Sequence, residues 1–223
     1  MTRFFAAGIF TLLAVSTSII SATEIHLNGY GAGGVSSGTA NRATGGDGVA
    51  VGNGWTPNIS VAYDTLTPAF AHTNTGLGTW GGGYGNLDTV AFPNIPPESF
   101  GDFVGAWWFT PDLGYRVTIN SFDMGGYSFT DRPDQPIFIR TESGQVLWDG
   151  SGTVLGANGA HSSFAPNVSS TERLYIIFGD NWNVGIDNIN FDQAAIPEPS
   201  SLVLAGSLGV AAFFSWQRRK QRC

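Results

Sequence analysis

The chain has almost no cysteine and almost no lysine, and both absences limit what its central part can be. The only cysteine is Cys223 and the only lysine is Lys220, so residues 23–196 contain neither. Without disulfides this region must be stabilised by a packed core, for which it is long enough. Its sixteen acids and five arginines give a net charge of about minus eleven. That charge argues against binding to nucleic acid or to an anionic membrane.

Motifs of enzymatic catalysis are also missing. There is no G-x-S-x-G turn, residues 23–196 offer no cysteine nucleophile, and His26, His72 and His161 are too far apart in sequence for a known metal-ligand spacing. We therefore expect a protein that is not an enzyme. A glycan-degrading enzyme remains the alternative, because two of the sixteen acids can come together in the fold as a catalytic pair.

Two apolar segments lie near the ends of the sequence. The first follows Arg3 and contains no charged residue before Glu24. A basic start, an apolar run and the small residues Ser21-Ala22 are typical of a signal peptide, so we predict a signal peptide over residues 1–22. An uncleaved membrane anchor is the alternative, because the apolar stretch comes close to spanning length.

The second apolar segment, residues 202–216, is free of charge and is followed by a basic end. Fifteen helical residues reach about 22 Å, which is short of a bilayer core of about 30 Å. We predict a short transmembrane helix over about residues 200–217. The cations after it should stay in the cytoplasm and leave the middle of the chain exported. These cations are Arg218, Arg219, Lys220 and Arg222.

A proline-rich motif precedes this second segment. Pro197-Glu198-Pro199, the apolar stretch and the arginine-rich end occur in the order that resembles the PEP-CTERM sorting domain. The resemblance covers residues 196–223. It implies recognition by an exosortase, a membrane-embedded sorting enzyme of Gram-negative bacteria that make exopolysaccharide. It further implies an intermediate anchored in the inner membrane and a final location at the cell surface or in the extracellular matrix.

The middle of the chain, residues 23–195, is predicted to be one all-β domain. Glycine is abundant, with 31 in the whole chain, and separates short runs rich in β-branched and aromatic residues. We predict strands over 115–122 and 184–191, a hairpin over 136–148, and a central strand over 174–178 that is covered on both faces. Residues 31–54 and 75–85 are predicted to be long glycine-rich loops.

Many short strands in one domain favour a two-sheet β-sandwich of jelly-roll type. The segments 109–115, 121–127 and 184–189 resemble the jelly-roll bodies that many PEP-CTERM proteins carry. Those bodies are similar to galactose-binding-like and concanavalin-like sandwiches. This resemblance implies a fold, while sandwiches of this kind host many unrelated functions.

Aromatic residues provide the main functional hypothesis. Trp80-Gly81-Gly82-Gly83-Tyr84 places two large rings in a predicted exposed loop, where sugars can stack on them. Trp182 is predicted to lie at a strand end or turn. The alternative is that these rings cap the ends of the sandwich core, since tryptophan is usually largely buried.

Calcium is the candidate cofactor, because hard cations bind carboxylates and carbonyl oxygens of loops. Asp187 and Asn188 are the predicted ligands of a structural Ca²⁺, with ordinary turn or edge residues as the alternative. We thus expect an exported, non-catalytic surface or matrix protein with exopolysaccharide as its candidate partner. A purely structural matrix component is the further alternative.

Overall fold

The structure is a computed structural model that describes residues 22–27, 33–35, 38–40, 50–51, 56–95 and 102–197. The predicted signal peptide, apart from Ala22, lies outside the described residues. So do the predicted helix over 200–217 and the basic end 218–222. Among the residues that are described, no helix is long and apolar enough to cross a membrane.

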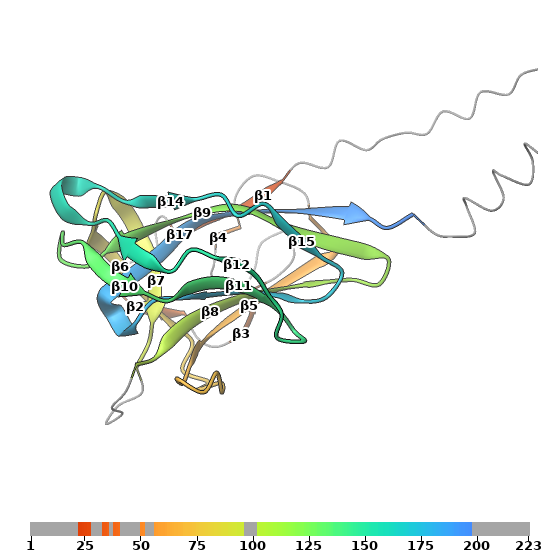
Figure 1. Ribbon diagram of the computed structural model, residues 1–223, viewed down its shortest axis with the longest axis horizontal. Coiled ribbons are helices and arrows are strands. Elements are labelled where there is room, and N and C mark those ends of the chain that lie inside the picture. The colour runs from red at the N-terminus through yellow and green to blue at the C-terminus, as the bar shows by residue number, and fades with distance from the viewer. Residues whose placement is uncertain are drawn as a thin grey trace, which may run out of the picture.

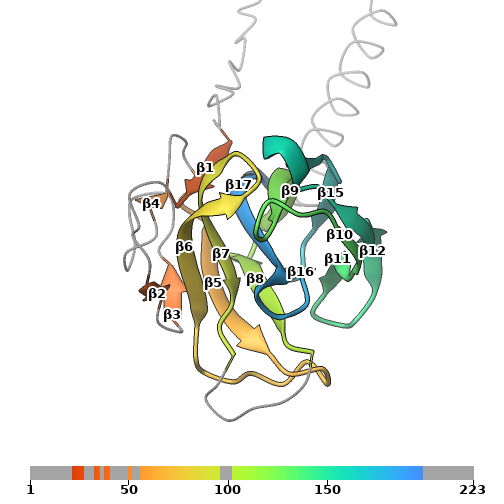
Figure 2. The same ribbon diagram turned by 90° about the vertical axis from the view of Figure 1, so that its left-hand side faces the viewer.

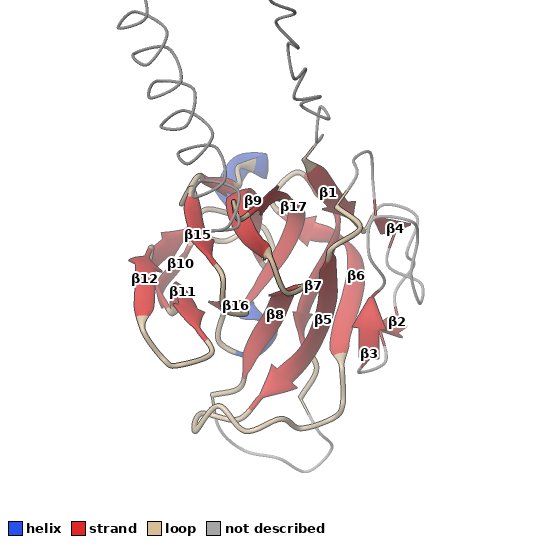
Figure 3. Cartoon of the chain, turned by 90° about the vertical axis from the view of Figure 1, so that its right-hand side faces the viewer, coloured by secondary structure: helices blue, strands red, loops and turns tan. Residues whose placement is uncertain are grey.

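The described residues form mostly β-strands, as expected for an all-β sandwich (Figure 1, Figure 3). Nine strands make sheet A: β1 (Thr23–His26), β2 (Gly33–Val35), β4 (Ala50–Val51), β6 (Leu77–Tyr84), β7 (Leu87–Pro93), β9 (Tyr115–Gly126), β14 (Ser162–Phe164), β15 (Val168–Ser170) and β17 (Val184–Ala195). Six make sheet B: β3 (Gly38–Ala40), β5 (Ile59–Leu66), β8 (Val104–Pro111), β11 (Ile137–Thr141), β12 (Val146–Asp149) and β16 (Leu174–Phe178). Between these, β10 (Arg132–Gln135) pairs with β13 (Gly152–Val154), and two short 3₁₀ turns are η1 (Ala157–Gly159) and η2 (Asn181–Asn183).

The order of the strands follows from antiparallel pairing in the described part of both sheets. Sheet A runs β14-β9-β17-β7-β6-β2, with β1 beside β17 and β15 beside β9. Sheet B runs β12-β11-β16-β8-β5-β3. The long strands β9 and β17 carry the longest pairing of the molecule's described residues and form the middle of sheet A (Figure 2).

Several strands occur where the sequence predicts them. All five residues of β16 are buried, which confirms a central strand covered on both faces. β9 buries Val117 and Ile119 and leaves the residues between them more accessible, as alternation requires. The hairpin over 136–148 is confirmed as β11 and β12.

The predicted loop over residues 75–85 is wrong. Leu77–Tyr84 is strand β6, paired with β7 on one side and β2 on the other. The glycines of this segment predicted a loop, but its pairing with the neighbouring strands holds it extended. The described parts of 31–54 likewise contain the short strands β2, β3 and β4.

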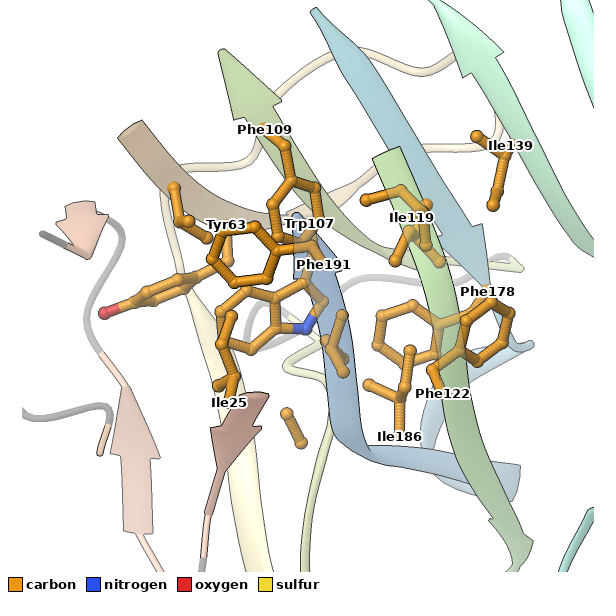
Figure 4. Packing of buried hydrophobic residues seen from close by; sticks show 14 of the residues in the cluster. Ile25, Tyr63, Trp107, Phe109, Ile119, Phe122, Ile139, Phe178, Ile186 and Phe191 are labelled. Carbon is orange, nitrogen blue, oxygen red and sulfur yellow. The ribbon is translucent and has the colours of Figure 1, made fainter. Parts of the chain in front are cut away.

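The core fills the space between the two sheets (Figure 4). Phe109 of sheet B and Phe191 of sheet A meet with ring centroids 4.9 Å apart, and Trp107 packs 4.8 Å from Tyr63. These side chains are fully buried. A large aromatic core of this kind explains how the domain is stable without a disulfide.

The two described ends of the chain emerge from the same end of the sandwich. β1 pairs with β17, with Thr23 opposite Phe191, and Ala195 ends β17 (Figure 1). We call this end the tail pole, defined by Leu113, Gly114, Tyr115, Ala195 and Ile196. Val184, the first residue of β17, lies at the opposite end of this strand from the tail pole.

Candidate functional site

An aromatic pocket lies on the outer face of sheet A, away from the core. Its lining residues are aromatic and come from distant parts of the chain: Trp80, Tyr84, Phe92, Tyr127 and Trp182. The pocket has a volume of about 270 Å³. This is close to the lower limit for small-molecule sites, which are typically about 300 to 1,000 Å³. We call these five residues the aromatic pocket.

The two tryptophans of the aromatic pocket are its exposed members. Trp80 is 45% exposed and Trp182 is 51% exposed. Leu77 of β6 packs in the core, so alternation along the strand points Trp80 to the outer face. Two exposed indole rings beside one pocket are available to contact a ligand.

Tyr84 has a different role from the one that the sequence predicts. Its side chain is buried, and its hydroxyl donates a hydrogen bond of 2.8 Å to the backbone carbonyl of Trp182. Burial raises the pKa of the Tyr84 phenol above its ordinary value, so the hydroxyl stays protonated and remains a donor. Tyr84 therefore fixes the turn that carries Trp182 and is not itself an exposed stacking surface.

The rings of the pocket pack on one another as well. Tyr84 and Phe92 are stacked with ring centroids 6.1 Å apart, and Tyr127 lies 5.1 Å from both Tyr84 and Trp182. Offset and tilted ring pairs of this kind are mutually stabilising. The pocket is thus held by its own aromatic neighbours before any ligand is present.

Glycines allow the rings to lie against the sheet. A Cβ atom on Gly78 would come within 2.5 Å of the Phe92 ring, and one on Gly185 within 2.3 Å of Val90 and 3.3 Å of Tyr84. Distances below about 3 Å are not tolerated without movement. Part of the glycine excess in the sequence therefore serves close packing of the aromatic pocket.

A network of polar side chains continues along the same face. Asp123 of β9 accepts hydrogen bonds from the Ser163 hydroxyl at 2.6 Å and from the Asn188 side-chain amide at 2.9 Å. The His161 ring contacts Asn86 through Nδ1 and lies 3.2 Å from the Ser163 hydroxyl through Nε2. Asn86 follows Tyr84 by two residues, and Gly125, two residues after Asp123, packs against the Tyr84 backbone, so the network adjoins the aromatic pocket at Tyr84.

This network does not have the order of a nucleophilic catalytic triad. In a triad the histidine lies between the serine and the acid and takes the proton from the serine. Here the serine hydroxyl donates directly to Asp123, which leaves Ser163 without activation by His161. The network supplies hydrogen-bonding groups at the border of the pocket.

Asp187 and Asn188, the predicted calcium ligands, come together on this face. Asp187 is 2% exposed and accepts a hydrogen bond of 3.0 Å from the backbone N–H of Leu27. The Asn188 side-chain oxygen lies 3.1 Å from Nδ1 of His26, and its amide donates to Asp123. The described residues contain no group of three or more His, Cys, Asp or Glu side chains that could hold a metal. These side chains are satisfied within the protein, and the calcium site stays a prediction.

Burial changes the acidity of Asp187. Loss of contact with water raises the pKa of this carboxyl to about 6, and the hydrogen bonds from the backbone N–H groups of Asn188 and Leu27 offset only part of the rise. Asp123 lies opposite Asp187 in the β9–β17 register and raises the pKa further. Asp187 is therefore a buried carboxyl group of sheet A.

Sequence reasoning found part of this site. It selected Trp80 and Tyr84 and noted Trp182, while Phe92, Tyr127, Asp123 and His161 were not selected. Phe92 looks like an ordinary strand residue, and Tyr127 follows two glycines without any distinguishing pattern. Only the pairing of β6 with β7, and of β9 with β17, brings these residues together.

The described residues thus define an all-β protein with an exposed aromatic pocket at one end and an exit for the C-terminal segment at the other. Residues 195–220 match the PEP-CTERM protein-sorting motif, which supports a PEP-CTERM protein. The motif implies export, an intermediate anchored in the membrane of a Gram-negative bacterium, and recognition by an exosortase-type processing enzyme. Pro197 is exposed at the end of the described region, and Glu198 and Pro199 lie outside it.

The rest of the chain has no such match. Comparison with curated proteins and with solved structures gives no match for this chain. The galactose-binding-like, jelly-roll character of the domain therefore stays a prediction. What the body binds has to be argued from its own residues.

Proposed function

We propose that this is a non-catalytic cell-surface or extracellular-matrix protein that binds polysaccharide through the aromatic pocket. The observation that carries the proposal is the pair of exposed indoles, Trp80 and Trp182, that both line one pocket. Sugar rings present apolar C–H faces that stack on aromatic side chains, while their hydroxyl groups need polar partners. The network around Asp123, Asn86 and His161 supplies such partners at the border of the pocket.

The burial of Asp187 argues against Asp123 and Asp187 as the catalytic carboxyl pair of a glycan-degrading enzyme. A glycosidase needs two carboxyl groups about 5 to 10 Å apart that both reach the substrate. Asp123 and Asp187 face each other in the register, but Asp187 is 2% exposed and is hydrogen-bonded to Leu27. A structural matrix component would need no pocket, and the two exposed indoles favour ligand binding over that alternative as well.

The test is binding of the full chain to a panel of polysaccharides that includes the exopolysaccharide of the producing bacterium. We expect Trp80→Ala and Trp182→Ala each to reduce binding at least about fivefold, the effect of losing one stacking contact worth about 1 to 3 kcal/mol. Val146→Ala is the matched control, because Val146 is an exposed apolar residue of β12 in the other sheet. Binding that is unchanged in both tryptophan variants would refute the proposed site.

The same samples test the enzymatic alternative. Release of reducing ends from any polysaccharide of the panel, abolished in Asp123→Asn, would identify a glycosidase and overturn the non-catalytic part of the proposal. Binding without release of reducing ends is the outcome that we expect. If the wild type bound no polysaccharide, the structural matrix component would be favoured.

A further inference from the structure

The tail pole carries an exposed apolar tip. Leu113, in the turn between β8 and β9, is fully exposed, with 103% of its reference surface accessible. Ile196, just after β17, is 39% exposed. The backbone N–H of Ile196 donates a hydrogen bond of 2.8 Å to the carbonyl of Gly114. The tip and the first residue of the sorting segment are therefore held side by side.

The sorting segment places this tip close to the membrane. The apolar stretch begins at Leu202, five residues after Pro197. Five residues span at most about 18 Å even when fully extended. While the sorting segment is anchored in the bilayer, the tail pole cannot move further than this from the membrane surface. Leu113, beside the exit point, is then within reach of the interface between water and lipid.

We propose that Leu113 inserts into the lipid interface of the membrane while the protein is anchored by its sorting segment. A fully exposed leucine gains free energy when it leaves water for the headgroup and acyl boundary. Tyr115 and Arg116 follow it in β9, and tyrosine and arginine are residue types that anchor proteins at this interface. The tip is thus composed like a small interfacial anchor.

The net charge of residues 23–196 indicates whether the contact of Leu113 with the membrane is electrostatic or apolar. The body carries a net charge of about minus eleven, so an anionic membrane repels it as a whole. At the tip, Asp112 and Arg116 balance each other, and Leu113 between them is apolar. The contact is therefore apolar and local, and raising the salt concentration should not release it.

This orientation also determines where the aromatic pocket points. β17 has twelve residues and extends over about 40 Å between the pocket end at Val184 and the tail pole at Ala195. A tail pole held against the bilayer directs the opposite end of β17, next to which Trp182 of the aromatic pocket lies in η2, away from the membrane. The inference rests on the sorting segment and the tip, and does not depend on what the pocket binds.

The experiment uses the full chain with Cys223→Ser and one new cysteine, either Leu113→Cys or Leu155→Cys, labelled with an environment-sensitive fluorophore. Leu155 is the matched control: it is 41% exposed, and its carbonyl accepts a hydrogen bond from Gly126 at the pocket end. Each protein is reconstituted into vesicles of phosphatidylethanolamine and phosphatidylglycerol that contain a lipid with a nitroxide near the headgroup. We expect loss and a blue shift of emission at position 113, and neither at position 155, at low and high salt alike.

Equal, unquenched emission at positions 113 and 155 would overturn the proposal. If the label at 113 stays in water but Leu113→Ser slows removal of the sorting segment in native membranes, the tip contacts the sorting enzyme and the lipid contact is refuted. Unchanged near-ultraviolet circular dichroism shows that the variants are folded. Trp80→Ala should leave the quenching unchanged, which separates this result from the polysaccharide test.

Discussion

The outer faces of sheets A and B are both rich in aromatic residues, but the rings of sheet A line a pocket, whereas those of sheet B lie under a covering segment. On sheet B, Trp108 lies 5.9 Å from Tyr175, and the guanidinium of Arg140 lies over both Tyr175 and Phe70. The segment after β5 crosses this face and places His72 on Trp108, 5.0 Å away. Aromatic content alone therefore does not define a binding site, because a covering loop can pack against the same kinds of ring.

Each outer face also contains a buried carboxylate with a different degree of hydrogen bonding. Asp64, on sheet B, accepts hydrogen bonds from the backbone N–H groups of Thr65, Asn74 and Gly76. Asp187, on sheet A, accepts two, from the backbone N–H groups of Asn188 and Leu27, and has a raised pKa. Asp64 therefore holds the covering segment in place, whereas Asp187 is a group that the fold tolerates at a cost.

The largest effect is expected from removing the carboxylate that holds the cover of sheet B. Asp64→Ala leaves the buried backbone N–H groups of Thr65 and Gly76 without their acceptor. Loss of a buried, hydrogen-bonded charge should lower the free energy of unfolding by about 4 kcal/mol. Urea unfolding of the full chain in detergent measures it.

Asp131 provides the control for that measurement. It accepts hydrogen bonds from two backbone N–H groups as well, those of Gly156 and Ala157, but it is fully exposed. Asp131→Ala should therefore cost much less than Asp64→Ala. Equal losses would show that burial of Asp64 is not the reason for its importance.

The pH dependence of the free energy of unfolding should reveal the contribution of Asp187. The pKa of Asp187 is about 6 in the folded protein and about 3.8 when unfolded. The folded state therefore binds more protons between these values, and its stability falls as the pH rises from 4 to 6. At about 1.4 kcal/mol per pKa unit, the loss is about 3 kcal/mol and is complete above pH 6.

Asp187→Asn should remove this loss, because the amide oxygen still accepts the Leu27 N–H but carries no charge. The variant is expected to be more stable than the wild type at pH 7 and similar to it at pH 4. Unfolding curves at a series of pH values give the comparison. A wild-type slope that persists in Asp187→Asn would assign the effect to another group.

The packing of the aromatic pocket predicts a smaller effect at Gly185. Gly185→Ala places a methyl group within 2.3 Å of Val90, whose branched side chain has little freedom to move. Overpacking of this kind should cost about 2 kcal/mol and change the near-ultraviolet circular dichroism of the pocket tyrosines. Gly81→Ala on β6 is the control, because its methyl group would have ordinary contacts at 3.6 Å. Similar losses in the two variants would contradict the close-packing role of Gly185.

The smallest effect is expected from uncovering sheet B. Phe70→Ala removes a ring that contacts Arg140 at 4.8 Å and Phe138 at 6.0 Å. These contacts are partly exposed, so the loss should be about 1 kcal/mol. Thermal unfolding measures it. If Phe70→Ala also created binding to an apolar dye, the covering segment would be confirmed as the feature that distinguishes sheet B from sheet A.

The all-β fold class and the export of the chain could both be predicted from the sequence alone. The alternating and all-apolar runs specify β9, β16 and β17 because strand periodicity is local. The sorting motif could be recognised for a similar reason, because its three parts follow one another along the chain: Pro197-Glu198-Pro199, an apolar stretch and a basic end.

Which aromatic residues form the aromatic pocket depends on the tertiary structure. Trp80 and Trp182 are about a hundred residues apart, and the exposure of each depends on neighbours that long-range strand pairing supplies. The same pairing turned residues 77–84 from an expected loop into a strand and buried Tyr84. Burial is a property of the surroundings, and the surroundings of these rings come from segments that no local pattern connects.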